Sequence, residues 1–202
     1  MTRLCVATNN PGKQREFAQL LADWGGDIVF PADLGIDLEV EENGASFEEN
    51  AVLKARAYAA ASGLPTLADD SGLEVDALAG APGVFSARYA GVGASDQDRR
   101  QKLLAAMADT PLDRRSARFR CVVAIADPDG GVAVAAGACE GRIALKPRGT
   151  HGFGYDPIFY LPEYGCTMAE LRPELKNQIS HRARAIQAAR PLLDALMSDN
   201  ER

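Results

Sequence analysis

The sequence contains only two histidines, His151 and His181, and its four cysteines include no Cys-x-x-Cys pair. A zinc site built from histidine and cysteine is therefore not expected. Cys5 and Cys121 lie within apolar runs, where a free buried thiol is the usual state. Nothing in the sequence therefore requires an oxidising compartment.

The sequence also lacks a run of about 18 apolar residues and an N-terminal apolar segment of the signal-peptide type. We therefore expect no membrane span and a cytoplasmic location. The formal net charge of −6 argues against sequence-independent binding to nucleic acid. With 202 residues, of which 47% are hydrophobic and 25% charged, the chain has the composition of a globular protein. We expect one domain, residues 1–202, with two lobes.

Segments with strand patterning alternate with segments of helical spacing. Strands are expected at 4–7, 27–30, 67–70, 117–126 and 131–140. Helices are expected over 11–24 and 47–61, after the cap formed by Ser95 and Asp98, and from about 180 onward. Pro191 predicts a kink or early end of the last helix. This order predicts an α/β fold with a mixed sheet.

The segment 7–17, Ala-Thr-Asn-Asn-Pro-Gly-Lys-Gln-Arg-Glu-Phe, joins the first strand to the first helix. Asn10 is a suitable N-cap, and Pro11 fits the first helical position. The free N–H groups at such a helix start favour an anion, and Lys13 adds a positive charge. Because Gln14 follows Lys13, this is not a Walker A loop. The segment predicts either a phosphate-binding turn or a well-capped surface helix.

The segment 67–72, Leu-Ala-Asp-Asp-Ser-Gly, is expected to end an apolar strand in two acids. Like charges placed close together raise each other's pKa, so Asp69 and Asp70 are poor packing residues. Carboxylates are well suited to hold Mg²⁺ or to accept a proton from water. The alternative is an Asx-type turn after the strand.

More acids lie around the capping box Ser46–Glu49, which opens the second helix. One glutamate from this region that lies close to Asp70 would complete a metal site, and the glutamates present are Glu39, Glu41, Glu42, Glu48 and Glu49. Lys54 is two turns into the helix and can point toward the same place. A solvated lysine is the simpler interpretation of Lys54 alone.

The segment 149–165 places aromatic residues among four glycines. Glycine lets the backbone approach a ligand closely. Phe153 or Tyr155 can stack on a base, and Asp156 can accept a hydrogen bond from a ring N–H. A hydrophobic loop folded onto the core is the alternative.

A group of donors precedes and opens the last predicted helix: Lys176, Asn177, His181 and Arg182. Cations are disfavoured at a helix N-terminus, so this group indicates a partner that accepts hydrogen bonds. A basic surface helix is the simpler alternative. Taken with the phosphate turn, the acids and the aromatic loop, these donors describe a site for a nucleoside triphosphate.

These segments resemble the inosine triphosphate pyrophosphatase family over essentially the whole chain. The resemblance rests on six segments in the same order: Thr8–Lys13, Ser46–Ala51, Asp69–Leu73, Gly83–Tyr89, Gly152–Pro157 and Ile179–Arg182. Asn9 departs from the family pattern, in which glycine is frequent at that position.

The resemblance implies an elongated mixed sheet flanked by helices, two lobes with an active-site cleft between them, and a homodimer. It implies Mg²⁺-dependent hydrolysis of XTP, ITP and dITP to the monophosphate and pyrophosphate. Asp70 is then the catalytic acceptor and a metal ligand, with Glu41 chosen as the second ligand and Glu42 left open. One or two metal ions remain possible. The residues assigned to substrate binding are Thr8, Asn9, Asn10, Pro11, Gly12, Lys13, Lys54, Ser71, Phe153, Gly154, Tyr155, Asp156, Lys176, His181 and Arg182.

Two other functions stay open from the sequence. One is a nucleotide pyrophosphatase of related fold that acts on modified pyrimidines or methylated bases. The other is a nucleotide-binding module without catalysis.

Overall fold

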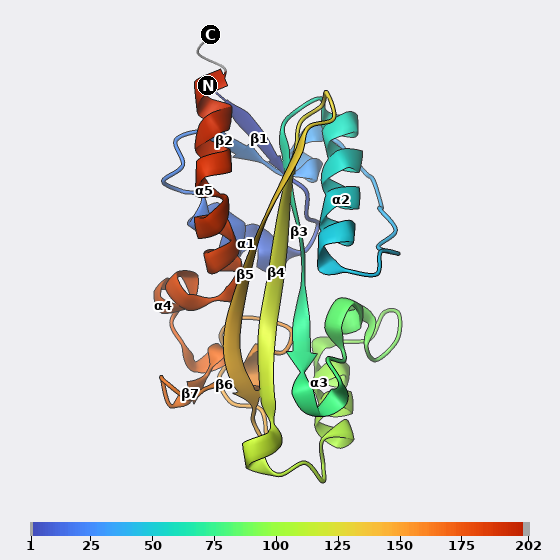
Figure 1. The fold of residues 1–202 in the computed structure, drawn as a ribbon, viewed down its shortest axis with the longest axis vertical. Coiled ribbons are helices and arrows are strands. Elements are labelled where there is room, and N and C mark those ends of the chain that lie inside the picture. The colour runs from blue at the N-terminus through green and yellow to red at the C-terminus, as the bar shows by residue number, and fades with distance from the viewer. Residues whose placement is uncertain (1, 200–202) are drawn as a thin grey trace. The chain divides into compact units, whose positions relative to one another are not determined.

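The computed structural model describes residues 2–199, which form two compact units, each built from separate chain segments. Unit 1 contains the described residues up to Asp70, residues 121–137, and those from Arg182 on. Unit 2 contains residues 71–120 and 138–181. Figure 1 shows the elements of both units.

The described strands form one seven-stranded sheet in the order β2-β1-β3-β4-β5-β6-β7. Their bounds are β1 (Arg3–Val6), β2 (Asp27–Val29), β3 (Thr66–Val75), β4 (Ser116–Ala126), β5 (Val132–Ile143), β6 (Phe159–Leu161) and β7 (Cys166–Thr167). Strand β1 runs parallel to β2 and β3, whereas β6 is antiparallel to β5 and β7. The sheet is therefore mixed, as predicted.

In unit 1, the alternation of side chains along the strands separates two packed faces. One face carries Leu4, Val6, Leu67, Cys121, Val123 and Ile125, which share a core with α1 (Pro11–Leu20) and α5 (His181–Asp199). The other face carries smaller buried residues such as Ala7 and Ala68. Helix α2 (Phe47–Ser62), with its buried alanines, lies on that side of β3 (Figure 1).

The predicted helix caps of unit 1 are confirmed. The Oδ1 atom of Asn10 accepts hydrogen bonds from the N–H groups of Gly12 (2.8 Å) and Lys13 (3.1 Å). Ser46 accepts from the N–H of Glu49 at 3.1 Å, and α2 ends at Gly63, whose φ of 66° is the left-handed conformation that glycine adopts easily. Short-range signals thus fixed both ends of α2.

Other expectations for unit 1 were wrong in detail. Helix α1 ends at Leu20, before Trp24, although Trp24 still packs in the core. Helix α5 continues through Pro191 to Asp199, so an early end at Pro191, one of the two expected alternatives, was wrong.

Unit 2 contains α3 (Asp96–Ala106) and α4 (Pro173–Ile179) around a second core. The predicted capping box of α3, Ser95 with Asp98, is confirmed. The segment expected to precede the last helix forms α4, a helix of its own with Pro173 at its start. Strands β6 and β7 were not predicted, because each is too short to show periodicity.

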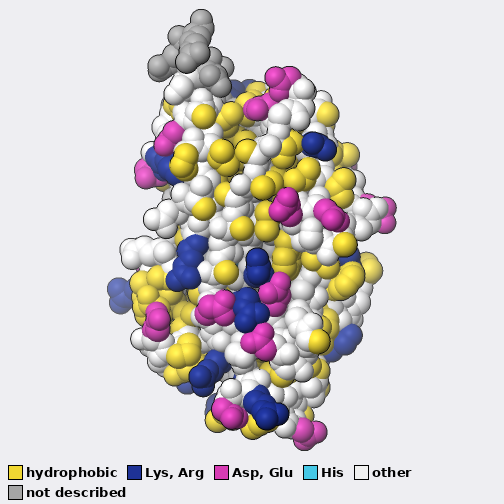
Figure 2. Space-filling model, in the orientation of Figure 1, with side chains coloured by type: hydrophobic (Ala, Val, Ile, Leu, Met, Phe, Trp, Pro, Cys, Tyr) yellow, Lys and Arg dark blue, Asp and Glu magenta, His cyan; other side chains and the backbone are white. Residues whose placement is uncertain are grey.

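No helix within residues 2–199 is long and apolar enough to cross a membrane. On the face drawn in Figure 2, acidic and basic side chains lie side by side instead of forming a patch of one sign. In unit 2, for example, Arg118 pairs with Asp76 and Glu140.

Candidate active site

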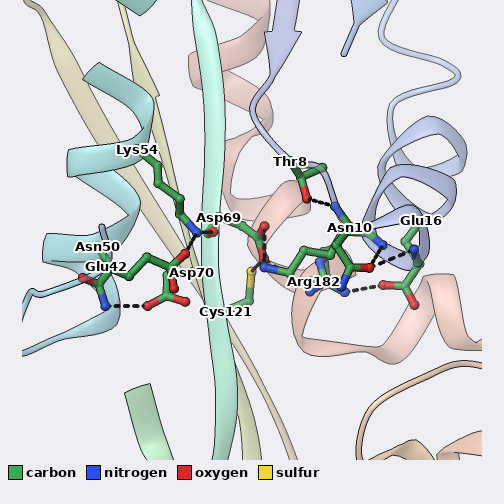
Figure 3. A network of polar contacts seen from close by, with 12 residues as sticks. Thr8, Asn10, Glu16, Glu42, Asn50, Lys54, Asp69, Asp70, Cys121 and Arg182 are labelled. Atoms are coloured by element: carbon green, nitrogen blue, oxygen red, sulfur yellow. Dashed lines mark hydrogen bonds and ion pairs between the residues drawn. The ribbon is translucent and has the colours of Figure 1, made fainter. Parts of the chain in front are cut away.

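The two neighbouring acids of β3 point to opposite faces of the sheet. The strand was expected to end at Asp70, but it continues to Val75, because Leu73 and Val75 are buried in the core of unit 2. A strand alternates its side chains, so Asp69 faces Arg182 and Cys121 while Asp70 faces α2 (Figure 3). The two acids are therefore not a pair.

Asp69 is a buried acid held by cations. Its carboxylate accepts from Nζ of Lys13 at 2.9 Å and from Nη2 of Arg182 at 3.3 Å, and it is 1% exposed. Burial alone would raise its pKa, but the charges of Lys13, Arg182 and Lys54 outweigh burial and lower the pKa of Asp69 below its usual value. Asp69 is thus a fixed negative charge that orients Lys13.

Asp70 lies in a different environment. Its Oδ2 atom accepts from the side-chain amide of Asn50 at 2.9 Å. Burial raises the pKa of Asp70, and the nearby negative charge of Glu42 raises it further, against the opposing effect of Lys54. Asp70 is therefore a better proton acceptor than an exposed carboxylate.

Lys54 links the two acids of β3 to the segment before α2. Its Nζ donates to Oε1 of Glu42 and to the backbone carbonyl of Asp69, both at 2.5 Å. Burial opposes its charge, but Asp69, Glu42 and Asp70 together raise the pKa of Lys54. A permanent positive charge therefore lies beside Asp70, as Figure 3 shows.

The structure favours Glu42 over Glu41 as the acid beside Asp70. Glu41 is exposed, whereas Glu42 is half-buried, contacts Lys54 and acts on the pKa of Asp70. The choice of Glu41 does not fit this arrangement.

The predicted phosphate turn leads from β1 into α1. Thr8 Oγ1 accepts from the N–H of Asn10 at 3.2 Å, and Asn10 caps the helix. Asn9, Asn10 and Pro11 are exposed, while Gly12 is buried under them. The first N–H groups of α1 are bonded to Asn10, so the charge available to an anion at this turn is that of Lys13 on the first turn of the helix.

Arg182 does not have the surroundings expected of a base contact. It is 2% exposed, and its guanidinium pairs with Glu16 and Asp69 within unit 1. These two carboxylates raise its pKa despite burial. Arg182 is thus part of a buried ion-pair network.

In unit 2, a second buried ion pair lies under the aromatic loop. Lys176 Nζ donates to Oδ2 of Asp156 at 2.6 Å and lies 5.1 Å from the centre of the Phe153 ring. The N–H of Phe153 also donates to Oδ2 of Asp156, at 2.9 Å. Gly152 has φ +78°, and a Cβ there would lie 2.1 Å from Asp156 Oδ2. Only glycine lets the backbone cover this ion pair.

Two predicted base contacts of unit 2 are packed inside it. Tyr155 belongs to the core, and its hydroxyl donates to the carbonyl of Ser86 at 2.9 Å. His181 stacks on Phe119 with ring centres 4.7 Å apart. Of the two aromatic residues proposed as a stacking wall, the half-buried Phe153 is therefore the better candidate. Gly154 and Ser71 are also half-buried.

Sequence reasoning missed two residues of this site, Asn50 and Glu16. Both are polar residues on the buried face of a helix, Asn50 beside Ala51 and Glu16 beside Phe17. A buried polar side chain needs a partner, so their position on an apolar face was the available signal. Their partners, Asp70 and Arg182, are distant in sequence.

The chain matches known proteins over nearly its whole length. Residues 4–192 match the sequence profile of the Ham1 family. The chain is 54% identical over 198 residues to a protein of Photorhabdus laumondii named dITP/XTP pyrophosphatase, covering 97% of this chain and 98% of that protein. It is 52% identical to the Escherichia coli protein of the same name, with the same coverage.

Solved structures agree with the fold. The structure of a HAM1 protein from Coxiella burnetii superposes with a TM-score of 0.87 at 44% identity, covering 96% of this chain and all of that one. The Ham1 protein of Staphylococcus aureus superposes with a TM-score of 0.83, also at 44% identity, covering 98% of this chain and all of that one.

Proposed function

The chain belongs to the Ham1 family, and on that premise we propose that it hydrolyses non-standard purine nucleoside triphosphates, namely XTP, ITP and dITP, to the monophosphate and pyrophosphate. The observation that carries this proposal is the arrangement in unit 1. A raised-pKa carboxylate, Asp70, lies with Lys54 and Glu42, and the capped turn of α1 belongs to the same unit.

The proposal includes Mg²⁺, held by Asp70 and Glu42. Within residues 2–199 no three acidic, histidine or cysteine side chains converge on one metal position. Two carboxylates nevertheless fit Mg²⁺, which is usually held by one or two carboxylates, water and substrate phosphates. Burial is the main cause of the raised pKa of Asp70, and the negative charge of Glu42, which adds to it, is the kind of effect that a bound cation relieves. When bound, Mg²⁺ supplies positive charge to the phosphate oxygens and the leaving group.

The chain's own residues supply the rest of the chemistry. The ammonium of Lys13, which lies at the positive end of the α1 dipole, binds phosphate oxygens. Asp70 accepts the proton of the water that cleaves the α–β phosphoanhydride, and Asn50 holds the Asp70 carboxylate in place. Lys54 offsets negative charge that develops beside Asp70.

Base recognition is assigned to unit 2. We place the base against the ring of Phe153, where Lys176 Nζ can donate to a 6-oxo group. Hypoxanthine and xanthine have that oxygen, whereas adenine presents a 6-amino group, which is itself a donor and cannot accept from the lysine. Arg182 is not proposed as a base contact, because it pairs with buried carboxylates. His181 is proposed to shape the site by stacking on Phe119.

Identification of the products tests the reaction type. Incubation of the protein with ITP and Mg²⁺, followed by ³¹P NMR, is expected to give IMP and pyrophosphate in equal amounts. Release of IDP and inorganic phosphate would mean cleavage at the other anhydride. Binding of ITP without any product would leave a nucleotide-binding module and reject the proposed enzyme.

Replacing Lys13 by alanine is expected to raise KM for ITP by about 10- to 100-fold, with little change in base preference. The loss of a charged hydrogen bond to phosphate, about 1.5–3 kcal/mol, sets this size. Arg15→Ala is the matched control, because Arg15 is an exposed cation on the same helix. Unchanged kinetics in Lys13→Ala would remove the turn from the phosphate site.

The family resemblance further implies a homodimer, and we propose that state together with a cytoplasmic location. Light scattering of the purified protein measures its oligomeric state. A monomer at micromolar concentration would contradict it.

A further inference from the structure

Helix α3 holds one residue of the aromatic loop by both of its backbone polar groups. The N–H of Gly154 donates to Oδ2 of Asp96, and the carbonyl of Gly154 accepts from Nη1 of Arg100, each at 2.7 Å. Asp96 and Arg100 are separated by one helical turn, so both side chains lie on the same side of α3. Both bonds involve a charged group, which makes them stronger than bonds between neutral groups.

The loop residues beside Gly154 depend on this attachment. Gly154 has φ +59°, a conformation that an unattached chain leaves readily. Phe153 precedes it, with a half-buried ring, and the hydroxyl of Tyr155 is bound to Ser86 on the other side. The loop is therefore attached at two residues: at Tyr155 through its hydroxyl and at Gly154 through α3. The ammonium of Lys176 lies over the ring of Phe153.

The N-terminal turn of α3 is itself held in position. Arg99 pairs with Asp96 and also donates to the carbonyls of Ala87 (2.7 Å) and Ala94 (2.8 Å). The Gly154 N–H and Arg99 keep the pKa of Asp96 low although burial opposes this, so the carboxylate is charged at neutral pH. The acceptor for Gly154 is thus already in place before any ligand arrives.

We propose that Asp96 and Arg100 are positioning residues that fix the Phe153–Asp156 loop for base recognition and so set the base selectivity of the enzyme. A loop ordered in advance loses less conformational entropy on binding, which favours the matching base. Neither residue touches the reacting phosphates in this assignment. The inference rests on the proposed function, because it takes the loop of unit 2 as the base-contacting segment.

Asp96→Ala is expected to raise KM for ITP at least about tenfold, since small misplacements of positioning groups have effects of that size or larger. The ratio of kcat/KM for ITP to that for ATP should fall, while kcat and product inhibition by pyrophosphate stay near wild type. Arg100→Ala should act in the same direction. Asp96→Asn should recover most of the loss, because its amide oxygen can still accept from Gly154.

Amide hydrogen exchange of the peptide covering residues 150–158 provides a readout independent of activity. Exchange should accelerate in Asp96→Ala and return toward wild type in Asp96→Asn. Gln101→Ala is the matched control, because Gln101 is exposed on the same helix. If Asp96→Ala does not fold, Arg100→Ala gives the same comparison.

Two results would overturn the inference. One is faster exchange of the loop with unchanged KM and unchanged base selectivity, which would leave α3 with a purely structural role. The other is a fall in kcat, or a weaker inhibition by pyrophosphate, by the same factor as the rise in KM. Failure of the proposed function is seen separately, because the wild-type protein would then hydrolyse none of ITP, dITP and XTP.

Discussion

Asp70→Asn is expected to lower kcat for ITP by about 10²–10⁴-fold while the protein stays folded, the range for loss of a general base. The amide is nearly the same size as the carboxylate and can still accept from Asn50. It cannot take a proton from water, and it is a poorer ligand for Mg²⁺.

The direction in which Asp70→Asn changes the stability of the folded protein can also be predicted. Burial raises the pKa of Asp70 in the folded protein, so its ionised form is disfavoured by folding at neutral pH. Removal of the charge in metal-free buffer should therefore leave the melting temperature unchanged or higher. Glu48→Gln, on the exposed first turn of α2, is the matched control. Near-wild-type turnover in folded Asp70→Asn would reject Asp70 as the base.

Arg182→Ala is expected to lower the free energy of unfolding by about 3–5 kcal/mol, because it removes a buried cation that pairs with two buried carboxylates. Arg182 is one of the largest fully buried side chains, and it pairs with both Glu16 and Asp69. Urea denaturation at pH 7 measures the loss. Arg184→Ala, at an exposed position on the same helix, should change stability little.

This variant also separates two roles for Arg182. Wild-type stability combined with lost discrimination between ITP and ATP would mean that Arg182 contacts the base, as the sequence had suggested. Lost stability with retained discrimination in the surviving folded fraction is the result that the buried pairs predict.

Features with local causes could be predicted from the sequence. The caps at Asn10, Ser46 and Ser95 involve bonds within four residues, and the residue types alone identify them. The mixed sheet followed from the order of apolar segments. The family assignment needed six segments at once, since each is short.

Features set by distant contacts could not be predicted. The Asp-Asp-Ser-Gly segment looks like a turn, but burial of Leu73 and Val75 in unit 2 extends β3 through it. The opposite directions of Asp69 and Asp70 follow only once that strand is known. Arg182 lies 113 residues from Asp69 and 166 from Glu16, so no local pattern could reveal its partners.

The most direct test of the proposed function is a comparison of kcat/KM for ITP, dITP, XTP, GTP and ATP at one Mg²⁺ concentration. A site that pairs the 6-oxo group of the base can reject adenine by about 10⁴–10⁵-fold. We expect similar high values for ITP, dITP and XTP and almost none for ATP. Guanine shares the 6-oxo group, so the low value that we expect for GTP has to come from exclusion of its 2-amino group. Hydrolysis of ATP as fast as that of ITP would contradict the account.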